Sequence, residues 1–90
     1  MKIKLNRPIT INGVEMKEIE LDFDKLTGAD LISASRETRL LGDSPIVPEL
    51  SKQYMAIVAA KAAGLNVDDI MKLSARDFTA VTLAVQNFLL

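Results

Sequence analysis

The chain has 90 residues and a nearly even charge balance, with 11 Lys and Arg against 12 Asp and Glu and a formal net charge of −1. It contains no His, Cys or Trp. These absences exclude an imidazole base, a thiolate nucleophile, a disulfide framework and a zinc site built from the usual ligands. The remaining polar side chains form no catalytic pattern. We therefore predict a protein that is not an enzyme and that uses no cofactor.

Charge and hydropathy along the chain exclude two further classes of partner. Residues 1–23 and 45–90 are each neutral and residues 24–44 carry −1, so there is no basic stripe for nucleic acid. The longest apolar run, residues 55–60, is far shorter than the roughly 20 residues that cross a bilayer. Residues 6–8 interrupt the apolar stretch that a signal peptide would need. We expect a cytoplasmic protein with no nucleic-acid and no membrane partner.

Residues 1–23 are predicted to form a β-hairpin. Apolar side chains occupy odd positions between Ile3 and Ile11, and Asn12-Gly13 follows directly, a pair that favours the positive φ angles of a two-residue turn. The apolar positions change parity after residue 16, which predicts a bulge near Lys17 and Glu18. Pro8 has no N–H to donate, so its strand is expected to be an edge or to bend there.

Residues 27–90 are predicted to form helices, because capping residues recur along this part of the chain. Thr27 with Asp30, Asn66 with Asp69, and Ser74 with Asp77 each place a capping side chain three residues before a carboxylate. The predicted helices run from Gly28 to a cap at Gly42, from Pro48 to Ala63 before Gly64, from Asn66 to Leu73, and from Ser74 to the C-terminus. The expected fold is α+β, a single small domain over residues 1–90 with an N-terminal β-hairpin packed on three to four α-helices.

The last two long helices carry the candidate binding residues. No ionisable side chain occurs between Phe78 and Leu90, whereas an ordinary surface helix has a charged outer face. This helix is therefore expected to be buried on more than one side or to meet a partner. The helix that ends at Ala63 is rich in alanine, so it lies either inside the domain or against another chain. The candidate partner-binding residues are Ala59, Leu83, Ala84 and Leu90.

One spacing leaves a different function open. A DNA-binding helix-turn-helix has a small residue, a turn glycine and two apolar residues at the intervals found in Ala60, Gly64, Ile70 and Leu73. The second helix of that unit would present Asp68 and Asp69 to phosphates, with no basic cluster nearby. A small helix-turn-helix regulator remains an alternative.

Two pairs of carboxylates resemble magnesium ligands, but each has a simpler explanation. Asp22 and Asp24 lie where a strand gives way to a turn, and Asp68 and Asp69 lie in the first turn of a helix, where negative charge is favourable. We assign no metal site to either pair.

The order of elements and a set of short motifs resemble the tail assembly chaperone family of contractile-tailed phages, often called the E-type. The matching residues are 26–32, Arg36-Glu37, 47–52 with Tyr54, 58–64, Asp77-Phe78, Val81 and 85–90. The resemblance extends over essentially the whole chain, and none of its motifs is catalytic.

The resemblance implies a non-enzymatic chaperone that binds the tape measure protein and keeps it soluble while the tail tube assembles. It implies a location in the host bacterial cytoplasm and absence from the mature virion. Homo-oligomers, and a longer form of the chain made by ribosomal frameshifting, are further expected partners. A structural tail component is the second alternative, since such a protein would stay in purified particles.

Overall fold

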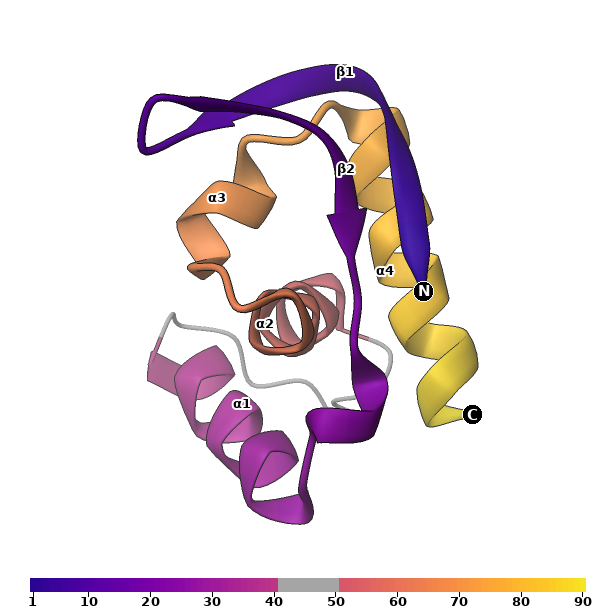
Figure 1. Ribbon diagram of the computed structural model, residues 1–90. Coiled ribbons are helices and arrows are strands. Elements are labelled where there is room, and N and C mark those ends of the chain that lie inside the picture. The colour runs from indigo at the N-terminus through magenta and orange to yellow at the C-terminus, as the bar shows by residue number, and fades with distance from the viewer. Residues whose placement is uncertain (41–50) are drawn as a thin grey trace.

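The computed structural model describes residues 1–40 and 51–90 of the chain. A β-hairpin arches over a group of helices in which α2 is central (Figure 1). In chain order the elements are β1 (Lys2–Ile11), β2 (Val14–Glu20), the 3-10 helix η1 (Phe23–Lys25), α1 (Gly28–Leu40), α2 (Lys52–Ala63), α3 (Val67–Met71) and α4 (Ala75–Leu89). The predicted α+β fold is confirmed, with an N-terminal hairpin and four α-helices in the described part of the chain.

The hairpin closes at the predicted turn. Asn12 and Gly13 have φ angles of 52° and 80°, the left-handed conformation that this dipeptide tolerates. The strands are antiparallel, with Ile11 paired to Val14 near the turn and Lys2 paired to Glu20 at the open end. Each strand pairs only with the other in the described residues, so β1, which contains Pro8, is an edge strand as predicted.

A large irregularity interrupts β1. The register changes between Lys4, which pairs with Glu18, and Ile9, which pairs with Met16, so residues 5–8 of β1 lie opposite the single residue Lys17. The predicted bulge is therefore at the right place along the hairpin, but the additional residues belong to β1 and not to β2. They let the strand bend across the helices, since extra residues in one strand increase local twist and curvature.

The helix starts follow the predicted caps with one correction. Thr27 Oγ1 accepts a hydrogen bond from the Asp30 backbone N–H, and Asp30 Oδ2 accepts one from that of Thr27. The start predicted at Pro48 is wrong, because Ser51 has extended backbone and its hydroxyl accepts a 3.2 Å hydrogen bond from the Tyr54 N–H, so α2 begins at Lys52. Pro48 and the predicted cap Gly42 lie outside the described residues.

The other helix ends are close to prediction. α2 stops at Gly64, whose φ of 70° is left-handed, and the Leu65 N–H closes this cap on the Ala60 carbonyl oxygen at 2.9 Å. α3 ends at Met71 and not at Leu73. The Ser74 hydroxyl accepts a hydrogen bond from the Asp77 N–H, which fixes the start of α4.

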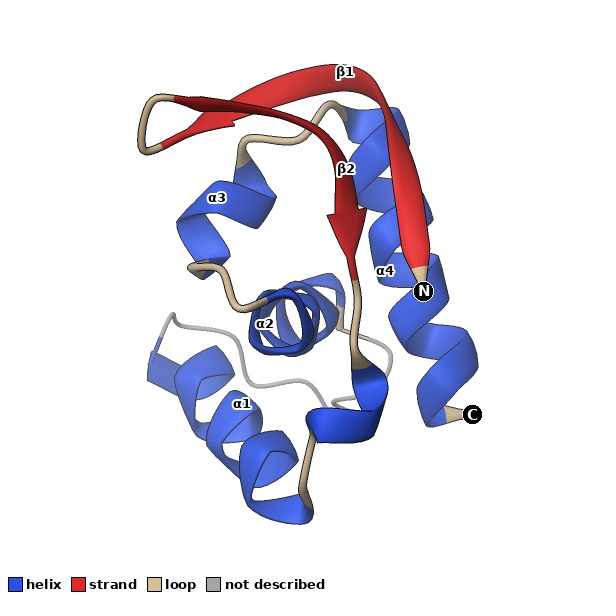
Figure 2. Cartoon of the chain, in the orientation of Figure 1, coloured by secondary structure: helices blue, strands red, loops and turns tan. Residues whose placement is uncertain are grey.

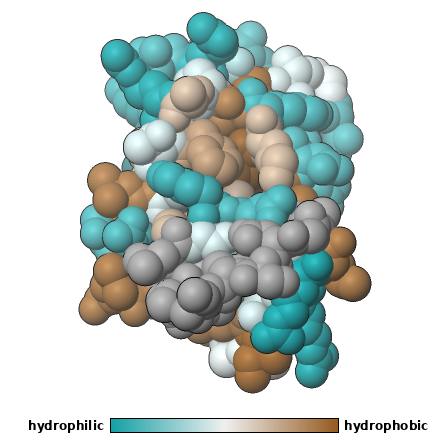
Figure 3. All heavy atoms as spheres, turned by 180° about the vertical axis from the view of Figure 1, so that it is seen from behind, coloured by the Kyte–Doolittle hydropathy of each residue, from teal (hydrophilic) through white to brown (hydrophobic). Residues whose placement is uncertain are grey.

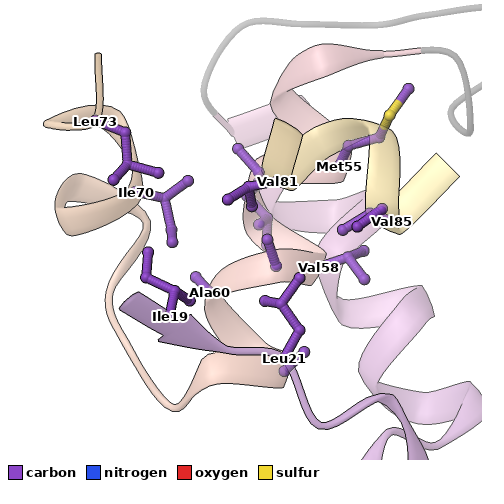
Figure 4. Packing of buried hydrophobic residues seen from close by; sticks show 14 of the residues in the cluster. Ile19, Leu21, Met55, Val58, Ala60, Ile70, Leu73, Val81 and Val85 are labelled. Atoms are coloured by element: carbon purple, nitrogen blue, oxygen red, sulfur yellow. The ribbon is translucent and has the colours of Figure 1, made fainter. Parts of the chain in front are cut away.

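α2 is the centre of the hydrophobic core. It lies among α1, α3, α4 and β2 and contacts each of them (Figure 2). Its side chains from Tyr54 to Ala60 are all buried. Side chains from α3, α4 and β2 converge on it (Figure 4). The alanines let these elements approach closely, so α2 lies inside the fold, which was one of the two positions that its composition allowed. Burial of one side chain such as Val58 stabilises the fold by about 1.5–3 kcal/mol.

Candidate partner-binding surface

The inner face of α4 is part of the core. Val81, Thr82 and Val85 are fully buried, and Thr82 Oγ1 accepts a 2.9 Å hydrogen bond from the Lys52 ammonium of α2. The same hydroxyl donates to the carbonyl oxygen of Phe78. Polar Thr82 is therefore satisfied within the fold, and this face of the helix is not available to a partner.

The opposite face of α4 is exposed and almost free of charge. Its members recur at alternating intervals of four and three residues and are all solvent-exposed: Arg76, Ala80, Leu83, Asn87 and Leu90. At 3.6 residues per turn these positions lie within about 40° of one line along the helix. We call this set the α4 outer stripe. Leu83 is 50% exposed and Leu90 is 80% exposed.

The α4 outer stripe lies at one margin of the molecule. In Figure 1, α4 and the hairpin end that holds the N-terminus occupy one side, and α1 occupies the opposite lower side. In the space-filling view from behind, hydrophobic residues project from the margins of the molecule, and hydrophilic residues cover much of the hairpin end (Figure 3). Exposed apolar side chains on a helix without charged neighbours are typical of a surface that contacts another protein.

The structure separates the four candidate residues into two groups. Leu83 and Leu90 lie together on the α4 outer stripe, two turns apart and exposed. Ala59 and Ala84 are buried in the core, Ala59 in α2 and Ala84 on the inner side of α4. In this conformation only the two leucines are accessible to a partner. Their role in binding remains a prediction.

A pair of aromatic rings fixes the C-terminal end of α4. Phe88 lies at helical spacing from the buried Val81 and Val85, yet it is 45% exposed. Its ring stacks on that of Phe23 in η1, with centroids 4.4 Å apart and planes inclined by 7°. Periodicity alone gave no sign of this contact, because Phe23 is more than sixty residues away in the sequence. The stack holds the last turn of α4 against the end of the hairpin.

A buried carboxylate fixes the other end of α4. Asp77 is 2% exposed, and its two oxygens accept hydrogen bonds from the backbone N–H groups of Asn6 at 2.8 Å and Arg7 at 2.9 Å. These two residues belong to the irregular segment of β1. The sequence predicted Asp77 as an ordinary capping residue, but its carboxylate bonds to the hairpin and so joins β1 to α4.

The surroundings of Asp77 favour its charged form. Burial raises the pKa of this carboxyl, but hydrogen bonds from the backbone of Arg7 and Asn6 and from Ser74, together with the Arg7 charge, outweigh that effect. The pKa of Asp77 is therefore lowered from its ordinary value. The group serves as a structural anchor at the start of the helix that carries the outer stripe.

A second apolar surface lies between α1, α2 and α3. Leu40, Ile57 and Val67 line a shallow hollow, and Glu37 at its edge forms a 3.0 Å ion pair with Lys61. The Glu37 oxygen in this ion pair, Oε2, is buried and accepts no hydrogen bond from the described residues. The charged pair distinguishes this surface from the α4 outer stripe.

The region around α3 does not have the features of a recognition helix. α3 has five residues, and the buried Asp69 carboxylate accepts hydrogen bonds from the Asn66 N–H and the Lys72 ammonium. Asp69 is thus used in capping, and Asp68 is exposed where DNA phosphates would approach. In the ranges 1–40 and 51–90 no three His, Cys, Asp or Glu side chains are grouped so that they could hold a metal ion. No helix in these ranges is long and apolar enough to span a membrane.

An exposed helix face with two large apolar residues and a single charge is typical of small domains that bind other proteins. Comparison with protein families gives a match, over residues 2–90, to the family described as phage tail assembly chaperone proteins, E, or 41 or 14. The chain therefore belongs to this family of phage tail assembly chaperones, as the sequence motifs had indicated. Neither the curated proteins nor the solved structures give a significant match. A chaperone family points to a non-enzymatic role and to interaction with phage tail proteins.

Proposed function

We propose that this chaperone binds the tape measure protein and keeps it soluble in the host bacterial cytoplasm while the tail tube assembles. The observation that carries the proposal is the family match over residues 2–90, and the α4 outer stripe supplies the surface. Copies of the chain itself and a frameshifted longer form are further proposed partners.

The α4 outer stripe suits a helical client. An amphipathic helix binds by placing apolar side chains at intervals of three and four residues against an apolar surface. Leu83 and Leu90 are the exposed apolar residues of the stripe, and the helix offers no charge between them that a client would have to desolvate. Complete burial of a leucine is worth about 1.5–3 kcal/mol, so each contact is weak. Solubility of a long client would then depend on several copies bound along it.

The test is co-expression with the tape measure protein, comparing its soluble fraction with the wild-type chain and with Leu83→Asp. A charge at this half-exposed position should reduce both the soluble fraction and co-purification, because an aspartate in the contact loses its hydration. The matched control is Ile32→Asp, since Ile32 is 60% exposed on α1, on the other side of the molecule. Equal loss of client solubility in both variants would contradict the assignment to α4.

The composition of purified particles separates this function from that of a structural tail component. A chaperone should be missing from washed virions, whereas a tail component should be present in them in a fixed ratio to the tube protein. Retardation of duplex DNA at low salt would instead favour the helix-turn-helix alternative.

A further inference from the structure

We propose that the hollow between α1, α2 and α3 is a second docking site. Its occupant is a segment of another protein in which a large aliphatic side chain stands next to a Lys or Arg. In Figure 1, α1 and α3 lie on one side of α2 and α4 lies on the other. The hollow is therefore separate from the α4 outer stripe, and the proposal can hold or fail independently of tape measure binding there.

One end of the hollow is apolar and has the size of a single side chain. Leu40, Ile57 and Val67 line a volume of about 200 Å³ there. Sites for small molecules usually enclose about 300–1,000 Å³, so this end suits one aliphatic side chain and not a whole small-molecule ligand. Leu40 is 85% exposed, and a partner that covers it removes apolar surface from water.

The other end of the hollow is polar and carries a net negative charge. It has a volume of about 370 Å³ and is lined by Lys61, Asn66 and Asp68, and Glu37 belongs to both ends. Two carboxylates and one ammonium leave a net charge of −1 at this end. A cation supplied by a partner is therefore electrostatically complementary to it.

The Glu37 carboxylate has hydrogen-bonding capacity that the fold does not use. Its Oε2 lies 3.0 Å from the Lys61 ammonium and is buried, yet it accepts no hydrogen bond from the described residues. Most buried polar atoms in folded proteins have a partner, and a carboxylate can accept about four hydrogen bonds. The Glu37 side chain as a whole is 46% exposed, so a donor can approach the carboxylate from solvent. A Lys or Arg of the partner adds a charge-assisted hydrogen bond at this place.

The two ends together select the composition of the segment. An uncharged apolar segment would take water from Glu37 and Asp68 without replacing its hydrogen bonds, which costs free energy. An acidic segment would be repelled by both carboxylates. The α4 outer stripe contains no carboxylate side chain, so it does not make the same selection. A segment with adjacent aliphatic and basic side chains matches both ends of the hollow at once.

The test is a titration of the isotope-labelled 90-residue chain with short peptides, followed by NMR. The probe is Gly-Ser-Leu-Arg-Ser-Gly with blocked ends, and two control peptides replace its Leu by Ala or its Arg by Glu. We expect the probe to cause saturable shifts of the backbone amides of Leu40, Lys61 and Val67, and none at Leu83. The alanine peptide should bind about tenfold more weakly, because it loses most of one aliphatic burial. Equal binding of the three peptides, or no saturable shift at the hollow, would overturn the proposal.

A charge reversal in the chain tests the polar end. Asp68 is exposed in the first turn of α3, so Asp68→Lys should remain folded, which urea denaturation checks. This variant should prefer the glutamate peptide to the arginine peptide, the reverse of the wild-type preference. Glu37→Gln should weaken binding of the arginine peptide by about two- to fivefold, as expected of a partly exposed ion pair. An unchanged preference in folded Asp68→Lys would contradict the proposal.

The matched control is Leu83→Asp, which should bind the arginine peptide as the wild-type chain does. The same substitution is expected to reduce tape measure binding by α4, so the two surfaces are tested separately. If Leu83→Asp remained folded but lost the arginine peptide, the peptide would be bound by α4 and the hollow would not be its site.

Discussion

Asp77 is the residue that joins the two parts of the fold. The Ser74 hydroxyl accepts a hydrogen bond from the Asp77 N–H, and the Asp77 carboxylate accepts hydrogen bonds from the N–H groups of Asn6 and Arg7. The bend of β1 leaves these two N–H groups without a partner in β2. These hydrogen bonds are partly buried, and a charged acceptor forms stronger hydrogen bonds than a neutral one. The bend of β1 and the start of α4 are therefore stabilised by the same side chain.

Replacement of Asp77 by Asn should reduce the free energy of unfolding by about 1–3 kcal/mol. The amide keeps one acceptor oxygen but sets an N–H₂ group against a backbone N–H, so one of the two backbone donors loses its acceptor beside a buried side chain. Urea denaturation followed by circular dichroism measures the change. The control is Asp24→Asn, an exposed carboxylate in η1, for which we expect a change within about 0.5 kcal/mol. An equal effect of both substitutions would contradict the anchoring role of Asp77.

The lowered pKa of Asp77 predicts a loss of stability in acid. Its folded-state pKa lies below the unfolded value, so its contribution is complete above the ordinary aspartate pKa of about 3.9. The contribution is lost as the pH falls from there through the lower folded-state pKa. Urea midpoints measured from pH 7 to pH 2 should show the wild-type chain and Asp77→Asn converging below about pH 4. A difference that stays constant down to pH 2 would be inconsistent with this assignment.

Among the elements, those that depend on local chemistry were predictable from the sequence. Asn12-Gly13 specified the turn, Thr27 with Asp30 specified the start of α1, and Gly64 specified the end of α2. Each of these signals acts within four residues, so no knowledge of distant contacts was needed. The start of α2 was misplaced because Pro48 and Ser51 are both acceptable starts, and local preference does not distinguish them.

The features that sequence reasoning missed depend on residues far apart in the chain. The extra residues of β1 are explained by Asp77, some seventy positions away, and the position of Phe88 is explained by Phe23. In the candidate surface, Leu83 and Leu90 were identified from the lack of charge on α4. The burial of Ala59 and Ala84 follows from how closely α2 and α4 pack, which composition did not reveal.

Charge at the start of α4 affects the stability of the helix. Arg76→Glu replaces an unfavourable cation in the first turn by an anion, which should raise the free energy of unfolding by about 0.3–1 kcal/mol. Thermal unfolding measures the change.

The control for Arg76→Glu is Arg39→Glu, in the last turn of α1. There the cation lies at the favourable end of the helix, so its reversal should lower stability by a similar amount. Parallel changes in both variants would show that the helix dipole does not govern these positions.

At the scale of the whole molecule, α2 fills the interior, and α4 packs one face against the core and exposes the other to solvent. The core takes up the alanine face of α2 and the inner face of α4, and charged side chains cover the hairpin. The α4 outer stripe remains exposed, and Arg76 is its charged member. The proposed client would therefore bind without opening the core.

This division of α4 predicts that client binding can be lost without loss of the fold. Leu83→Asp should not bind a helical peptide from the tape measure protein, but its free energy of unfolding should stay within about 0.5 kcal/mol of the wild-type value, because Leu83 is 50% exposed. Arg76→Glu keeps Leu83 and Leu90, so it should bind the peptide as the wild-type chain does. Fluorescence anisotropy of a labelled peptide measures binding, and urea denaturation measures stability. Unfolding of Leu83→Asp would instead place Leu83 in the core.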